Sequence, residues 1–246
     1  MRLNSPQINI ITKACLKASR SLIRDFGEIE NLQVATKAPG DFVTSADQRT
    51  EKILINELQK AHPDYGIVTE ESGIINKDNN KNRWIIDPID GTSNFLHGIP
   101  HFAISIALKS NKEIVSGLVF DPIKNEMFYG EKNNGAYFNN QRIRVSKKKN
   151  LDECLFATGG KNEILNSLNV RKTGSAALDM AYVGAGRFDG YFQKNLNIWD
   201  VAAGIIIVNE AGGKINNINY SSKEVIKILA GSNSVYDKMI ENLNNF

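Results

Sequence analysis

The feature that most restricts the fold of this chain is an apolar run that ends in two carboxylates, WIIDPIDGTSNF. Its first residues predict a short buried strand. Asp87 and Asp90 follow, with Pro88 stiffening a turn between them, and Gly91 and Thr92 begin a short helical segment. Carboxylates bind hard cations such as Mg²⁺, and N–H groups at a helix start bind phosphate. The run indicates a metal and phosphate site, or, more simply, a turn with two solvated aspartates.

Three further acidic segments follow a related pattern. Glu70 and Glu71 end another apolar strand, Asp200 begins a strongly apolar helix, and Asp41 and Asp47 surround the start of the second helix. Taken singly, each has a plainer explanation as a polar strand end or a helix cap. Together they predict carboxylates that converge at one edge of a sheet, where like charges repel unless cations are bound.

The spacing of apolar residues predicts a mixed, layered α+β or α/β architecture. Helices are expected at 5–27, Ser45–Ala61, 175–186, 199–211 and over the last dozen residues. Strands are expected at 66–69, 84–86, 102–108, 114–120, 126–129, 135–138, 142–145, 155–158, 190–193 and 227–231, with a hairpin turn at Asn139 and Asn140.

Composition excludes several classes of protein. The 246 residues carry 30 Lys and Arg against 27 Asp and Glu, a net charge of +3 that does not by itself indicate nucleic-acid binding. No apolar run is long enough to span a membrane, and the N-terminus lacks a signal peptide. Cys15 and Cys154 are isolated, which excludes a disulfide framework. We expect a cytoplasmic protein with one domain over 1–246, its halves meeting at about residue 146.

Other catalytic motifs are absent. The sequence has no GxxxxGK[ST] phosphate loop, no GxGxxG between a strand and a helix, and no GxSxG elbow. His97 and His101 are separated by Gly98 and Pro100, which break the helix that a zinc-binding pair would need. The chain also lacks an evident nucleophilic Cys or His dyad.

On these residues the chain resembles the inositol monophosphatase family, including its bacterial SuhB-type members. Its two signatures are DPIDGT from Asp87 and the WD…EAGG stretch from Trp199, and the segments at Glu70 and from Asp41 to Asp47 also match. The resemblance implies an αβαβα sandwich of the inositol monophosphatase and fructose-1,6-bisphosphatase type. It also implies a homodimeric, often lithium-sensitive hydrolase that uses two or three Mg²⁺ ions.

The resemblance further implies a substrate and a set of site residues. The default substrate is myo-inositol monophosphate; fructose 1,6-bisphosphate, histidinol phosphate and 3′-phosphoadenosine 5′-phosphate are alternatives. The implied metal ligands are Glu70, Asp87, the carbonyl of Ile89, Asp90 and Asp200. The implied catalytic residues, which orient an in-line attacking water, are Asp47, Glu70 and Thr92. The implied substrate contacts are the N–H groups of Gly91 and Thr92, with Gly174, Ser175, Ala176, Gln193 and Asp200.

Two departures from the family pattern affect specificity. Gln193 stands where the family commonly carries a Glu that binds substrate hydroxyls, and the stretch between Gly160 and Thr173 is shorter than in typical members. The shorter stretch leaves three possibilities open: a wider pocket, a changed dimer contact or weaker folding.

Two alternative functions also remain open. One is a SuhB-like role in binding RNA or a transcription complex. Its candidate surface is Lys147, Lys148 and Lys149, with Arg142 and Arg144 nearby. A solvated hairpin edge is the plainer explanation of these basic residues. The other is an inactive family member. The complete acidic set argues against it, because a cluster of acids is costly to keep without a metal.

Overall fold

The structure is a computed structural model that describes residues 5–29, 34–38, 41–75, 81–160, 168–216, 218 and 226–242. The helices in this part are α1 (Pro6–Gly27), α2 (Ser45–Ala61), α3 (Thr92–Leu96), α4 (Ala176–Gly184), α5 (Ile198–Glu210) and α6 (Asn233–Asn242). A two-stranded sheet pairs β1 (Val34–Ala38) with β2 (Asp41–Thr44).

Two larger sheets carry the other described strands. The eight-stranded sheet contains β3 (Gly66–Thr69), β4 (Gly73–Ile75), β5 (Asn82–Asp90), β6 (Ala103–Ser110), β7 (Glu113–Asp121), β8 (Glu126–Glu131), β9 (Gly135–Phe138) and β10 (Gln141–Arg142). The five-stranded sheet contains β11 (Leu155–Ala157), β12 (Asn169–Arg171), β13 (Gly190–Leu196), β14 (Lys214–Ile215) and β15 (Ile226–Gly231).

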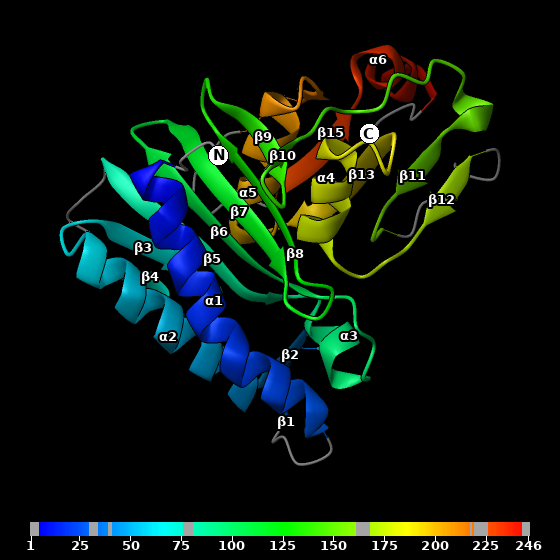
Figure 1. Ribbon diagram of the computed structural model, residues 1–246. Helices are drawn as coiled ribbons and strands as arrows, with labels where there is room; N and C mark the ends of the chain where they lie inside the picture. The colour runs from blue at the N-terminus through cyan, green and yellow to red at the C-terminus, as the bar shows by residue number, and fades with distance from the viewer. Residues whose placement is uncertain are drawn as a thin grey trace.

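Helices and sheets alternate in five layers (Figure 1). The pair α1 and α2 covers one face of the eight-stranded sheet, and α4 and α5 lie between the two large sheets. The five-stranded sheet follows, and α6 packs against its edge strand β14 and the neighbouring β15. The predicted αβαβα sandwich is confirmed. No helix of the described part is both long and apolar enough to cross a membrane.

The first helix shows why local signals predict element ends well. Ser5 Oγ accepts a hydrogen bond from the N–H of Ile8 at 3.2 Å, and Pro6 occupies the first turn, where no backbone donor is lost. The buried stripe contains Ile8, Ile11 and Leu22, and the helix ends at Gly27 as predicted. The predicted bounds of α2 are also confirmed.

The strand that carries the paired aspartates differs from the prediction. Instead of turning at Pro88, β5 continues to Asp90, and its register against β6 shifts between Asp87 and Asp90. Proline lacks the N–H that a regular ladder needs, and such an irregularity is where a sheet tolerates it. Both carboxylates therefore stay on a rigid strand and are buried, with exposed fractions of 2% and 7%.

Several short elements are absent from the prediction. These are β1, β2, β4, β12 and β14, each too short to show a clear apolar period. The strand expected at 142–145 shrinks to β10, and the helix expected at 175–186 ends at Gly184. Most of the shortened stretch after Gly160, at 161–167, lies outside the described residues, as do the last four residues of the expected C-terminal helix.

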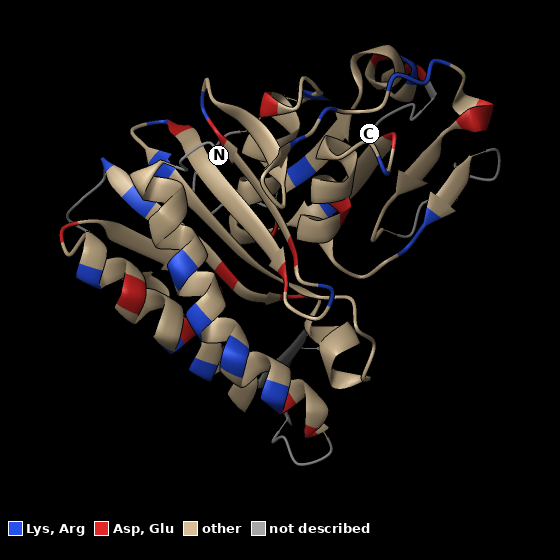
Figure 2. Ribbon diagram, viewed as in Figure 1, with Lys and Arg blue, Asp and Glu red and all other residues tan. Residues whose placement is uncertain are grey.

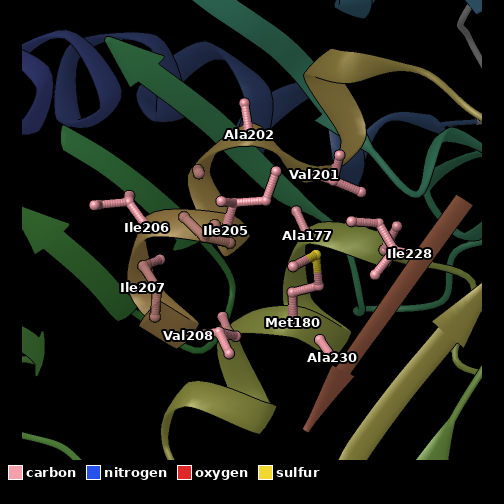
Figure 3. Close-up of a cluster of buried hydrophobic side chains, with 14 of the residues drawn as sticks. Ala177, Met180, Val201, Ala202, Ile205, Ile206, Ile207, Val208, Ile228 and Ala230 are labelled. Carbon is pink, nitrogen blue, oxygen red and sulfur yellow. The ribbon is translucent and has the colours of Figure 1, made fainter. Parts of the chain in front are cut away.

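A close-packed apolar cluster fixes the two inner helices. Figure 3 shows Ala177 and Met180 of α4 facing α5 residues such as Ile205, with Ile228 of β15 beside them. Gly204 allows this approach, because a Cβ there would lie 2.5 Å from Met180 Cβ. The cluster sets the positions of the N-terminal ends of α4 and α5 beneath β5 and β6.

Candidate active site

The carboxylates singled out from the sequence lie close enough to repel one another. Burial raises the pKa of Asp87 well above its ordinary value, and the charges of Glu70, Asp90, Asp200 and Asp47 raise it further. These side chains come from the ends of β3 and β5 and from the first turns of α2 and α5. The fold thus brings five acids from four separate segments into one electrostatic cluster.

The N-terminus of α4 holds Asp90. The N–H groups of Ala176 and Ala177 donate to Asp90 Oδ1 and Oδ2 at 3.2 and 3.0 Å, and Ser175 Oγ donates to Oδ2. Burial raises the pKa of Asp90 to about 6, although these hydrogen bonds act in the opposite direction. The start of α4 thereby orients the Asp90 carboxylate, because the N-terminus of a helix carries a partial positive charge that attracts an anion.

Asp200 faces the same cluster from α5. The helix begins after Asn197, whose N–H donates to Asp200 Oδ2 at 2.7 Å. The N-cap is therefore Asn197, and Asp200 caps from the third helical position. Burial raises the pKa of Asp200 well above its ordinary value, and repulsion from Asp90 and Glu70 raises it further. Asp200 therefore belongs to the acidic cluster as well as capping α5.

Local hydrogen bonds fix the backbone between Asp87 and Thr92. The N–H of Ile89 donates to Asp87 Oδ1 at 3.1 Å, and Thr92 Oγ1 donates to the carbonyl of Ile89 at 2.8 Å. Gly91 has a φ of +96°, and a Cβ there would lie 3.1 Å from the carbonyl oxygen of His101, so glycine is required by both conformation and space.

A cavity of about 280 Å³ opens beside these carboxylates. Its lining contains Asp90, Gly159, Gly174, Ser175, Ala176, Asp179, Gln193, Leu196 and Asp200. It thus brings together the residues that the sequence assigns to substrate contact on the C-terminal half of the chain. Asn94 of α3 holds the backbone next to the lining residue Gly174, because its Nδ2 donates to the carbonyls of His101 and Thr173 at 2.7 and 2.8 Å.

Glu51 is a buried carboxylate that the sequence reasoning missed. It accepts hydrogen bonds from Thr69 Oγ1 at 2.6 Å, from the N–H of Glu71 at 3.0 Å and from Ser72 Oγ. The turn that it holds carries Glu70. A sequence signal was available, since Glu51 follows Asp47 by one helical turn and both lie on the buried face of α2.

Glu71, by contrast, is not among the residues that line this cavity. It lines a second depression of about 360 Å³ with Gln48, Glu51, Lys52 and Ser72. The side chains of Asp41 and its neighbours to Thr44 lie outside the described part of the chain.

Among the described residues that line the cavity, none is basic. Figure 2 shows many basic residues on the outer faces of α1 and α2, where Lys17 and Lys60 pair with Glu57 at 2.8 and 3.0 Å. Of the three consecutive lysines suggested for nucleic-acid binding, Lys148 pairs with the buried Asp189 at 3.1 Å. The cluster is therefore partly neutralised.

The donor set at the acidic cluster fits a hard divalent cation. It consists of carboxylates and a backbone carbonyl, which are Mg²⁺ ligands. Burial raises the pKa of Asp87 and of Asp200, and repulsion from neighbouring carboxylates, which a bound cation would offset, raises both further. Among the described side chains, no three Asp, Glu, His or Cys groups already enclose a single ion position. The described carboxylates therefore lie near one another without yet forming a complete set of ligands around one ion.

A five-layer sandwich with an acidic cluster at the end of an inner strand defines a layered α/β protein. The chain belongs to the inositol monophosphatase family, whose sequence profile matches residues 3–245. It is 43% identical to inositol-1-monophosphatase of Mesorhizobium japonicum over 87% of this chain and 86% of that protein. It is 36% identical to Nus factor SuhB of Escherichia coli K12 over 97% and 96%.

A solved structure is also closely similar. The extragenic suppressor protein SuhB from Bartonella henselae superposes with a TM-score of 0.92 at 44% identity, covering 98% of this chain and 99% of that one. The similarity includes both large sheets and all described helices, because nearly the whole chain is aligned.

Proposed function

We propose that the protein is a Mg²⁺-dependent phosphoric monoester hydrolase that acts on a small phosphorylated alcohol, with myo-inositol monophosphate as the first substrate to test. The observation that carries this proposal is the mutual repulsion of Asp87, Asp90, Asp200 and Glu70 at the end of β5. Membership of the inositol monophosphatase family supports the same class of reaction.

The residues of the cluster have distinct tasks in this proposal. Glu70, Asp87, Asp90, Asp200 and the carbonyl of Ile89 would hold two or three ions. Bound Mg²⁺ supplies neutralisation of the phosphate dianion and acidifies water for attack on phosphorus. The strand β5 and the start of α4 hold Asp90 in one orientation before substrate arrives, and this lowers the cost of ordering the site.

Thr92 and Asp47 would handle the attacking water. Thr92 Oγ1 donates its hydrogen to the carbonyl of Ile89, which leaves its oxygen to accept a hydrogen bond from water. Asp47 is buried in the first turn of α2, and its carboxylate is a base for the proton that water loses. The N–H groups of Gly91 and Thr92 would donate to phosphate oxygens. The leaving alcohol would occupy the cavity lined by Gly174, Ser175, Ala176 and Gln193.

The test is phosphate release from a panel of inositol, sugar and nucleotide monophosphates. We expect release with Mg²⁺, loss with EDTA and inhibition by added Li⁺. Asp90→Asn should lose more than about 100-fold in kcat/KM, while the exposed Asp237→Asn should retain wild-type activity. Wild-type activity in Asp90→Asn, with Mg²⁺ present, would show that the assigned centre is wrong.

A second candidate rests on the relatives named Nus factor SuhB, such as the Escherichia coli protein. Binding to RNA would use the exposed Lys147 and Lys149. A gel shift that weakens with salt and disappears when both lysines become Ser would support this function, and the absence of any shift at low salt would remove it.

Light scattering would test the expected homodimer.

A further inference from the structure

The side-chain oxygen of Gln193 is fully engaged by the protein. Gln193 Oε1 accepts hydrogen bonds from Tyr191 Oη at 2.6 Å and from the N–H of Gly159 at 2.8 Å. Tyr191 is completely buried, and the Gly159 backbone lies directly against the Gln193 amide, leaving no room for a Cβ unless the amide moves. These contacts hold the amide in one position on the wall of the cavity.

These contacts also settle which way the amide faces. A backbone N–H can only donate, so the group opposite Gly159 must be the oxygen and not the NH₂ of Gln193. Burial raises the pKa of Tyr191 well above its ordinary value, so its hydroxyl remains a donor as well. The two N–H bonds of Gln193 Nε2 are left for a ligand, and no described residue accepts from them.

Gln193 differs from the three acidic side chains that line this cavity. Asp90, Asp179 and Asp200 present carboxyl oxygens, which suit the donating hydroxyls of an alcohol. Nε2 presents only donors, so the ligand atom beside it must accept. The adjacent Lys194 and the nearby Arg171 and Lys172 are exposed, and they add positive charge close in the chain to the lining residues Gln193 and Gly174.

We propose that Gln193 selects substrates whose alcohol half carries an acceptor oxygen without a hydrogen, namely a carboxylate, a second phosphate or a carbonyl. This inference rests on the proposed phosphatase function and narrows its substrate class. Selection follows because an N–H donor facing an acceptor-only oxygen is satisfied without reorienting either group, and an anionic acceptor makes the stronger hydrogen bond.

A matched pair of substrates tests the inference. Glycerol 2-phosphate and 2-phosphoglycerate differ only in that one hydroxymethyl group of the first is a carboxylate in the second. We expect wild-type kcat/KM to be higher for 2-phosphoglycerate. Gln193→Glu keeps the shape but offers an anionic acceptor, and should lower the ratio of the two kcat/KM values by about 10- to 100-fold. Gln193→Met, which offers neither donor nor acceptor, should give an intermediate ratio.

The ratio of the two kcat/KM values distinguishes a change in specificity from a loss of folded protein, because a misfolded fraction lowers both kcat/KM values equally. Gln141→Glu, an exposed change of the same charge in β10, should leave the ratio unchanged. A wild-type ratio below one, or the same ratio in wild type, Gln193→Met and Gln193→Glu, overturns this inference alone. Failure of the wild type to release phosphate from either compound or from myo-inositol 1-phosphate, with Mg²⁺ present, overturns the proposed function and this inference with it.

Discussion

The N–H of Ala177 donates to Asp90 Oδ2 at 3.0 Å, and this bond joins the eight-stranded sheet to the inner helical layer at the candidate site. Asp90 is the last residue of β5, whereas Ala177 lies in the first turn of α4, 87 residues further along the chain. The orientation of Asp90 within the acidic cluster therefore depends on the packing of α4 between the sheets.

Ser175→Ala should weaken both stability and activity. Ser175 Oγ donates to Asp90 and accepts from the N–H of Leu178 at 3.3 Å, so its loss removes a helix cap and a carboxylate partner together. We expect a loss of about 1 kcal/mol in the free energy of unfolding and of about tenfold in kcat/KM. Urea unfolding and phosphate release measure the two effects.

The cap of α1 supplies the control for this prediction. Ser5→Ala removes a cap hydrogen bond of similar length, donated by the N–H of Ile8, at a helix that packs against α2, β6 and β7. Stability should fall by a comparable amount while kcat/KM stays at the wild-type value. If both variants lose activity in proportion to stability, Ser175 has no specific role toward Asp90.

Glu51→Ala should impair the enzyme through the turn that carries Glu70. Removal of the carboxylate leaves Thr69 Oγ1, the N–H of Glu71 and Ser72 Oγ without their shared acceptor. We expect a loss of about 2 kcal/mol in stability and a higher Mg²⁺ concentration for half-maximal activity. Glu51→Gln should recover most of both, because the amide oxygen can take the place of Oε2 and the Ser72 hydroxyl can turn to accept.

Glu57 on the same helix is the matched control for Glu51. It pairs with Lys17 and Lys60, and the pairing lowers its pKa to about 2. Glu57→Ala should cause a small stability loss, present above pH 4.5 and fading as the pH falls toward 2, with no change in the Mg²⁺ requirement. An unchanged Mg²⁺ requirement in Glu51→Ala would mean that Glu51 does not position Glu70.

Local chemistry made part of this structure predictable from the sequence. The Ser5 cap, the following proline and Gly27 fix α1, and an apolar strand that runs into Asp87 and Asp90 marks the acidic cluster. The continuation of β5 through Pro88 was not predictable, because it depends on the register of β6, a partner outside the segment. The spacing of Glu51 from Asp47 placed it on the same helix face, but its role was not predictable, because its side-chain partners lie 18 and 21 residues away.

Asp179→Asn should make stability less sensitive to rising pH. Burial raises the pKa of Asp179 well above its ordinary value, and Thr173 Oγ1 donates to Oδ1 at 2.7 Å. A raised pKa in the folded state means that wild-type stability is greatest below the unfolded pKa and is lost as pH rises through the folded pKa. An amide keeps the acceptor for Thr173 and has no charge to bury.

The measurement is the difference in melting temperature between Asp179→Asn and wild type at pH 5 and pH 8, in EDTA so that metal binding does not contribute. The difference should grow in favour of the variant at pH 8. Parallel pH profiles for the two proteins would show that Asp179 does not titrate with a raised pKa.

Gly204→Ala should separate α4 from α5 and thereby disturb the site at a distance. A Cβ at Gly204 would lie 2.5 Å from Met180 Cβ, an atom attached directly to the α4 backbone, so the helices must move apart. We expect a loss of about 1–3 kcal/mol in stability together with a fall in kcat/KM, because Ala176 and Ala177 at the start of α4 hold Asp90.

Gly27→Ala is the control, because a Cβ at Gly27 would have no atom within 4 Å. It should leave activity unchanged and stability equal or higher. If Gly204→Ala unfolds at a lower temperature but keeps full kcat/KM, the position of α4 does not control the carboxylate.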